Sequence, residues 1–117
     1  MRFKIAIAIA CVTLMGVNLP ANAQKKYTLT QLRTMVDSRK YPDQAEPSSN
    51  KAESLDFAPC KALVEGLLAQ VSDNYPVRMI VETDLVFSKK IWINDAAVVY
   101  TCSKLDRNFV TVMSRYR

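Results

Sequence analysis

Cys60 and Cys102 are the residues whose chemistry this sequence predicts most directly. They lie far apart in the chain, whereas redox-active cysteine pairs usually occur as C-x-x-C. Two distant cysteines in an oxidising compartment are typical of a structural disulfide. A closed loop of about 43 residues stabilises the folded state by roughly 4 kcal/mol in the chain-entropy model. We therefore expect a Cys60–Cys102 disulfide that holds the fold together.

Glu82 and Asp84 are a pair of acids whose spacing suits acid–base catalysis. If one strand runs through both, their side chains lie on the same face of it. Carboxylate pairs of this kind serve glycosidases, but the polar sequence around them is also typical of a solvated surface. A small carboxylate-dependent hydrolase is therefore kept as an alternative, and the expectation is that the protein is not an enzyme.

Several common chemistries are missing from the sequence. The chain has no histidine, which excludes Ser-His-Asp and Cys-His catalysis and the usual zinc and copper sites. Its only glycines are Gly16 and Gly66, so no glycine-rich phosphate loop is present. No group of acids has calcium-loop spacing. The sequence predicts neither a metal nor a cofactor.

Two clusters combine bases with aromatic residues near the ends of expected strands. Trp, Tyr and Arg are the residue types most enriched at binding hot spots. Basic residues also protect edge strands from aggregation, and a tryptophan can equally belong to the core, so both interpretations stay open. The candidate partner-binding residues are Lys89, Lys90, Trp92, Arg115, Tyr116 and Arg117.

The first 23 residues predict export. Basic residues precede an apolar stretch over 5–17 that is too short to span a bilayer, and the tripeptide ending at Ala23 has the small-x-small pattern of signal peptidase sites. We expect a Sec signal peptide cleaved after Ala23, followed by one periplasmic or secreted domain over 24–117 with no membrane insertion. Lipidation at Cys11 is the alternative, although only about six apolar residues precede it.

The charge of the chain is mildly basic, with 16 Lys and Arg against 11 Asp and Glu. Loss of Arg2 and Lys4 with the leader reduces this excess, and the rest of it lies after Pro76. Such a bias is weaker than the dense basic patch of a nucleic-acid-binding domain. The sequence predicts a protein partner and no nucleic acid.

The main element is an amphipathic helix over about 56–74, for which Asp56 is a plausible N-cap. Its central Gly66 indicates close packing against a strand. The residues expected on its apolar face are Cys60, Leu63, Val64, Leu67, Leu68 and Val71.

A shorter helix comes before it. Thr28 and Gln31 have the spacing of a capping box, and Pro42 predicts that this helix ends near residues 38–40. The following segment, 41–54, has two prolines, three serines and no aliphatic residue larger than alanine. We expect this segment to be a flexible loop.

From Val77 onward the apolar pattern has a period of two, which predicts strands. The preferred pairing joins strands over 85–94 and 96–105 through a turn at Asn94-Asp95, and a last strand runs over 109–116. Val98, Tyr100 and Cys102 share one face, which the disulfide would place under the main helix. The first turn, near 83–84 or 88–90, and the strand register stay open.

The sequence thus predicts an α+β domain: two N-terminal helices, the second being the main one, packed on a three- or four-stranded antiparallel meander with one disulfide. The predicted function is an exported, non-enzymatic protein-binding module, such as a periplasmic inhibitor or immunity-type protein. An accessory subunit of a bacterial envelope assembly is the alternative, beside the small hydrolase.

Overall fold

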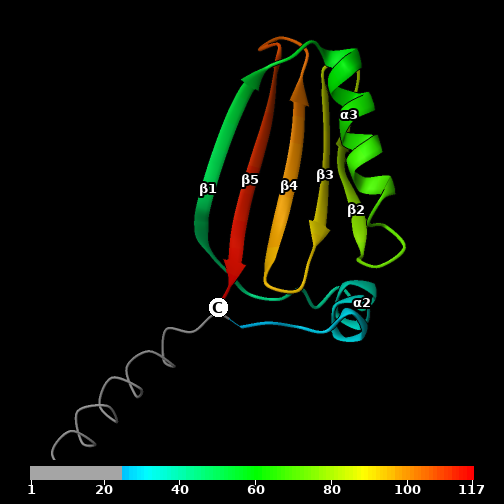
Figure 1. Ribbon diagram of the computed structural model, residues 1–117, viewed down its shortest axis with the longest axis vertical. Coiled ribbons are helices and arrows are strands. Elements are labelled where there is room, and N and C mark those ends of the chain that lie inside the picture. The colour runs from blue at the N-terminus through cyan, green and yellow to red at the C-terminus, as the bar shows by residue number, and fades with distance from the viewer. Residues whose placement is uncertain (1–24) are drawn as a thin grey trace, which may run out of the picture.

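The computed structural model describes residues 25–117 as two helices and one antiparallel sheet of five strands (Figure 1). The sheet order is β1-β5-β4-β3-β2. The elements are α2 (Leu29–Asp37), β1 (Gln44–Ser54), α3 (Phe57–Ala69), β2 (Val77–Glu82), β3 (Val86–Trp92), β4 (Ala96–Ser103) and β5 (Asn108–Tyr116). The α+β class is as predicted, but the sheet has five strands rather than three or four, and one strand lies between the two helices in the chain.

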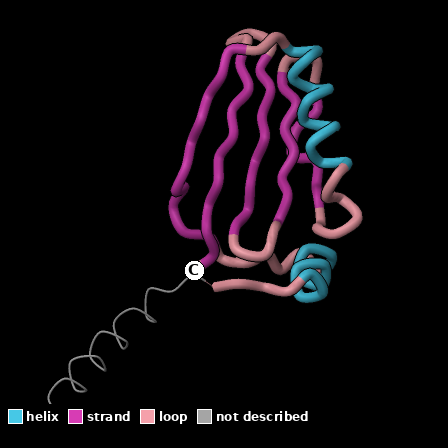
Figure 2. Tube along the Cα trace, in the orientation of Figure 1, coloured by secondary structure: helices cyan, strands magenta, loops and turns pink. Residues whose placement is uncertain are grey.

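The additional strand is β1, which follows one edge of the sheet (Figure 2). The prediction of a flexible loop over 41–54 is wrong for the residues that form this strand. Their side chains lack the apolar alternation of a half-buried strand, because none is aromatic or an aliphatic side chain larger than alanine, apart from Pro47. The strand exists because it pairs antiparallel with β5, with register shifts on either side of Pro47. Tertiary pairing therefore overrides the local pattern.

Helix α3 packs on one face of the sheet and overlaps β2 in the view of Figure 1. Its buried side chains are Cys60, Val64 and Leu68, one helical turn apart. The helix ends at Ala69, earlier than predicted, and Leu63 and Leu67 on its outer side are exposed. The interpretation of Gly66 is wrong: a Cβ added there would meet nothing within 4 Å among the described residues.

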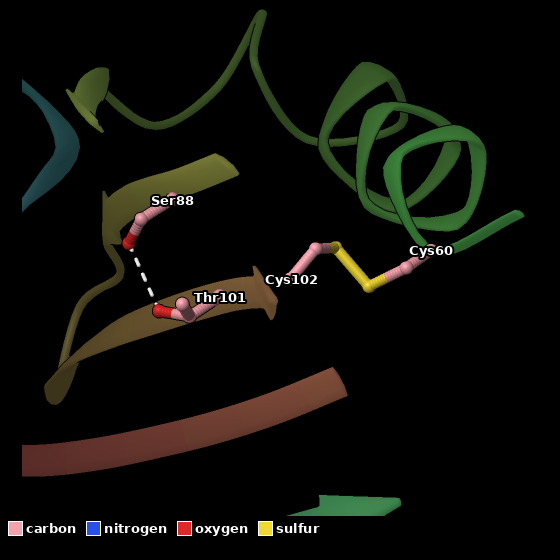
Figure 3. Close-up of a disulfide and its surroundings, with 4 residues drawn as sticks. All are labelled: Cys60, Ser88, Thr101 and Cys102. Atoms are coloured by element: carbon pink, nitrogen blue, oxygen red, sulfur yellow. Dashed lines mark hydrogen bonds between the residues drawn. A yellow bond between two sulfur atoms is a disulfide. The ribbon is translucent and has the colours of Figure 1, made fainter. Parts of the chain in front are cut away.

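Cys60 and Cys102 form the predicted disulfide between α3 and β4 (Figure 3). Their Cα atoms are 5.9 Å apart, and both side chains are completely buried. The bond lies in the core under α3, which includes Phe87, Ile91 and Val98 from the strands. A disulfide is compatible with the oxidising, exported location that was expected. The predicted signal peptide and the alternative at Cys11 lie outside the described residues.

Helix α2 packs against the other face, at one end of the sheet. Its capping box is confirmed, because the Thr28 amide donates to the Gln31 side chain at 2.8 Å and the Gln31 amide donates to the Thr28 hydroxyl at 3.1 Å. Leu32 and Val36 are buried against a cluster that contains Trp92 from β3. The two helices therefore do not share a face of the sheet.

Strands β2 to β5 form the predicted meander. The preferred turn is confirmed, because the Ile93 amide donates to the Ala96 carbonyl at 2.9 Å across Asn94 and Asp95. The first turn follows Glu82, where the Thr83 side chain accepts a hydrogen bond from the amide of Val86. Alternate residues thus face α3 or the opposite side of the sheet.

Figure 3 shows residues on the face of the sheet opposite α3, next to the disulfide. Ser88 of β3 and Thr101 of β4 point away from Cys102 and α3 in Figure 3. Their hydroxyl oxygens lie 2.9 Å apart, which joins the two strands by a side-chain hydrogen bond. Lys90 lies between Ser88 and Trp92 on this face of β3 and is partly exposed, whereas Ser88 and Trp92 are buried.

Candidate functional site

A hollow of about 410 Å³ opens on the molecule between the end of α2 and strands β2 and β3. We call it the basic hollow, because three of its lining side chains are cationic and two are aromatic. It is lined by Arg39, Tyr41, Arg78, Met79, Ile80, Lys90 and Trp92. Two of these residues, Lys90 and Trp92, belong to the predicted partner-binding residues.

The end of α2 brings Tyr41 into this hollow. After the C-cap at Ser38, Arg39 adopts a left-handed conformation with φ of 60°, and its amide donates to the Val36 carbonyl. The chain then turns toward β3, where the Tyr41 ring stacks on Trp92 with centroids 5.3 Å apart and planes at 11°. A stacked aromatic pair therefore forms one wall of the basic hollow.

Arg78 and Lys90 lie directly opposite each other in the β2–β3 pairing. Residues in this relation have neighbouring side chains on the same face, and like charges there are destabilising. The Arg78 guanidinium lies 3.0 Å from the carboxylate of Asp37, which offsets part of that repulsion. Both partners of this ion pair are substantially solvated, so it is a weak one.

Lys90 is the more enclosed of the two cations. Its Nζ donates to Oε1 of Gln44 at 2.6 Å and lies 5.0 Å from the Trp92 ring centroid. Desolvation by burial lowers the pKa of its ammonium group. Within residues 25–117 neither Lys90 nor Arg39 forms an ion pair, so of the three cations of the hollow only Arg78 has a carboxylate partner, Asp37. The basic hollow therefore has an excess of positive charge.

The other predicted site residues are dispersed over the molecule. Lys89 lies on the α3 side of β3, with its Nζ 5.5 Å from the Phe87 ring. Arg115 lies 3.9 Å from the Asp95 carboxylate. Tyr116 is buried with Trp92 under α2, and Arg117 is exposed. The structure thus brings Lys90 and Trp92 together at the basic hollow, buries Tyr116 behind Trp92, and places Lys89, Arg115 and Arg117 elsewhere.

Glu82 and Asp84, the candidate catalytic pair, do not lie on one strand as expected. Glu82 is the last residue of β2, and Asp84 lies in the following turn. The two carboxylates therefore do not share the face of one strand, and both residues are exposed. Among residues 25–117, no group of three or more potential metal-ligating side chains is present.

Strand β2 is the second distinctive surface, because it forms an edge of the sheet and its centre is apolar. Met79, Ile80 and Val81 in its centre are 41%, 51% and 37% exposed, and Leu85 after it is also exposed. In the described chain, β2 pairs only with β3, so its outer backbone groups have no strand partner. An exposed apolar edge of this kind can pair with another chain.

The opposite edge, β1, is protected. It contains Pro47, the charged residues Lys51 and Glu53, and two register shifts. Proline, charge and bulges are the devices by which sheets prevent pairing at an edge. Strand β2 has one register shift, no proline, and the charged residues Arg78 and Glu82 on either side of an apolar centre. Of the two edges, β2 is therefore the less protected against pairing.

Sequence reasoning missed Arg39, Tyr41 and Arg78 as members of the basic hollow. Arg78 was visible as a base in a strand, but its position opposite Lys90 depends on a register that the sequence leaves open. Pro42 was readable as a helix stop, whereas the stacking of the preceding Tyr41 on Trp92 depends on contacts between distant parts of the chain. The indole N–H of Trp92 has no hydrogen-bond partner among the described residues, and we have no physical account of it.

Comparisons with protein-family models, curated proteins and solved structures found no match to this chain. In the part of the chain that the structure describes, neither helix has the length and apolarity to cross a membrane.

Proposed function

We propose that this chain is an exported, non-enzymatic protein-binding module that binds its partner along the outer edge of β2. An extended segment of the partner would pair with this edge and continue the sheet by one strand. The observation that carries the proposal is the exposed apolar centre of β2, over Met79, Ile80 and Val81. A periplasmic inhibitor or immunity-type protein is the kind of module that we infer.

The asymmetry of the two edges supports this choice. A less protected apolar edge risks aggregation, so its presence in the same sheet as a protected edge favours a use for it. Main-chain hydrogen bonds give such a complex its affinity, and alternate side chains give it specificity. The disulfide supports the same role, because it links α3 to β4 and so stabilises the sheet to which β2 belongs.

The test compares one substitution at each edge of the sheet. Ile80→Lys places a charge in the middle of β2, and Asn50→Lys places the same charge in β1, which is also exposed. Wild-type protein and both variants are immobilised in oxidised form and incubated with an envelope extract of the native host. The captured proteins are identified by mass spectrometry, and the affinity of each purified partner is then measured.

The proposal predicts that Ile80→Lys abolishes capture and that Asn50→Lys retains it. Equal capture by all three proteins, or loss with Asn50→Lys alone, contradicts binding at β2. The captured protein also separates the two roles: a soluble enzyme or toxin supports an inhibitor, and subunits of a membrane complex support an accessory subunit. Both variants must melt close to wild type for the comparison to hold.

A further inference from the structure

We infer that the basic hollow receives a carboxylate side chain of the partner segment that pairs with β2, so that the partner strand is an acidic one. This inference rests on the proposed function and names the chemistry of its ligand. The basic hollow includes Arg78, Met79 and Ile80 of β2, so the pairing edge and the hollow are adjacent.

The sheet geometry places a strand paired with the outer edge of β2 close enough for one of its side chains to reach the basic hollow. A strand added beside β2 lies about 4.8 Å from it, and every second side chain points to the same face of the sheet. The partner residue opposite Arg78 on that face therefore lies next to the Arg78 side chain. Because Lys90 is the neighbour of Arg78 on the inner side, the three positions form one row across the sheet.

The charges of this row favour an acid at the added position. Arg78 and Lys90 repel each other across β2 and β3, and a carboxylate at the end of the row interacts favourably with both. The guanidinium of Arg78 has several donors in one plane, so a solvated partner such as Asp37 leaves room for a second carboxylate or can be replaced by it. Arg39 contributes a further cation with no ion pair in residues 25–117.

The surroundings strengthen such an interaction. Lys90 is half-buried, and its Nζ is bound by the neutral Oε1 of Gln44 rather than by a carboxylate. The stacked rings of Tyr41 and Trp92 exclude water from one side of the hollow. A charge pair that is partly buried is screened less by salt than one on an open surface. The exposed side chains of Met79 and Ile80 can also contact aliphatic residues that flank the acidic residue in the partner strand.

The basic residues elsewhere on the molecule do not offer the same arrangement. Arg107 forms an ion pair with Asp56 at 3.0 Å, and Arg115 lies 3.9 Å from Asp95. Each of these guanidinium groups has a carboxylate beside it, as Arg78 has Asp37. The basic hollow differs from them because Lys90 and Arg39 add two further cations that form no ion pair within residues 25–117.

The test uses a fluorescently labelled hexapeptide of alternating valine and glutamate, with a valine–glutamine hexapeptide as its uncharged match. Protein expressed from the full sequence and purified in oxidised form is titrated against each peptide by fluorescence anisotropy. We expect the acidic peptide to bind about tenfold more tightly than the neutral one at low ionic strength, as for hydrogen bonds to charged groups. The difference should shrink at about 0.5 M salt.

Substitutions locate the effect. Lys90→Gln and Arg39→Gln remove cations of the basic hollow, and each should bring the affinity for the acidic peptide close to that for the neutral one. Lys104→Gln removes an exposed cation from the β4–β5 turn, outside the residues that line the hollow, and should preserve the discrimination. Equal binding of the two peptides to wild type overturns the inference, and so does discrimination that survives in both hollow variants.

A peptide with N-methyl groups on alternate amides separates this inference from the proposed function. N-methylation blocks strand pairing and leaves the carboxylates in place. If methylation abolishes binding while charge makes no difference, edge pairing stands and the acidic partner is wrong. If charge discrimination survives methylation, the hollow binds carboxylates and pairing at β2 is wrong. No binding of either peptide contradicts both.

Discussion

The hydroxyl oxygen of Tyr116 lies 2.7 Å from the carbonyl oxygen of Ile93 and 2.8 Å from that of Ala96. These two carbonyls bracket the turn between β3 and β4, and the hydroxyl can donate its proton to either one. The ring of Tyr116 is 2% exposed and meets the Tyr27 ring edge-on at 5.1 Å. The last strand thus fixes this turn by a buried hydrogen bond.

This arrangement predicts loss of stability in alkali. Burial raises the pKa of Tyr116, and the charge of Asp95 adds to the increase. The unfolded chain releases the phenol proton near pH 10.0 while the folded protein retains it. The free energy of unfolding should therefore fall as the pH rises above about 10, by up to about 1.4 kcal/mol per pH unit from this group.

Tyr116→Phe checks the assignment by urea unfolding at several pH values. The variant should be about 1 kcal/mol less stable than wild type at neutral pH, because it lacks a buried hydrogen bond. Its loss of stability above pH 10 should be smaller than that of wild type. Tyr100→Phe, which changes a ring stacked on Phe109, serves as the control and should keep the wild-type slope. Parallel curves for wild type and Tyr116→Phe would contradict the prediction.

A second prediction concerns the disulfide. The double variant Cys60→Ser, Cys102→Ser removes the bond without leaving an unpaired thiol. We expect the free energy of unfolding to fall by roughly 4 kcal/mol, which lowers the melting temperature of a small domain by well over about 10 °C. Calorimetry or circular dichroism measures the change. A double variant that melts within a degree or two of wild type would falsify a stabilising role.

A third prediction uses Trp92, the only tryptophan of the chain, as an optical probe of the basic hollow. Tyr41→Ala uncovers one face of the indole, so the fluorescence of Trp92 should become easier to quench with acrylamide. The loss of the stacked pair should also lower the free energy of unfolding by about 1 kcal/mol. Tyr41→Phe keeps a ring in place and should behave like wild type. Identical quenching in all three proteins would show that the rings do not stack in solution.

The helices and the last four strands were readable from local patterns. The capping box at Thr28 and the period-two alternation after Val77 each reflect interactions between residues close in sequence. The disulfide was readable because the expected cleavage of the leader removes Cys11 and leaves one possible pair of cysteines. The first two interactions join residues that are close in sequence. The disulfide joins distant residues, but few cysteines were available to form it.

Strand β1 and the basic hollow depend instead on residues that are distant in sequence. The β1 segment contains Pro47 and no large apolar side chain, so only its pairing with β5 makes it a strand. The hollow requires Arg78 to lie opposite Lys90, which a shift of one residue in the β2–β3 register would undo. The separation of Lys89 from Lys90, by contrast, follows from strand alternation alone.

The sheet order has a consequence for the time course of folding. Strand β1 comes first in the chain and pairs with β5, which comes last, so Gln44 waits for Tyr116 before it has a backbone partner. Closing so long a loop delays the formation of the native sheet and slows folding relative to a simple hairpin array. During that interval the apolar segment β2 and the unpaired β1 are both open to other chains. Fast oxidation of Cys60 with Cys102 shortens the loop left to close, and thereby reduces the time in which the chain is vulnerable to aggregation.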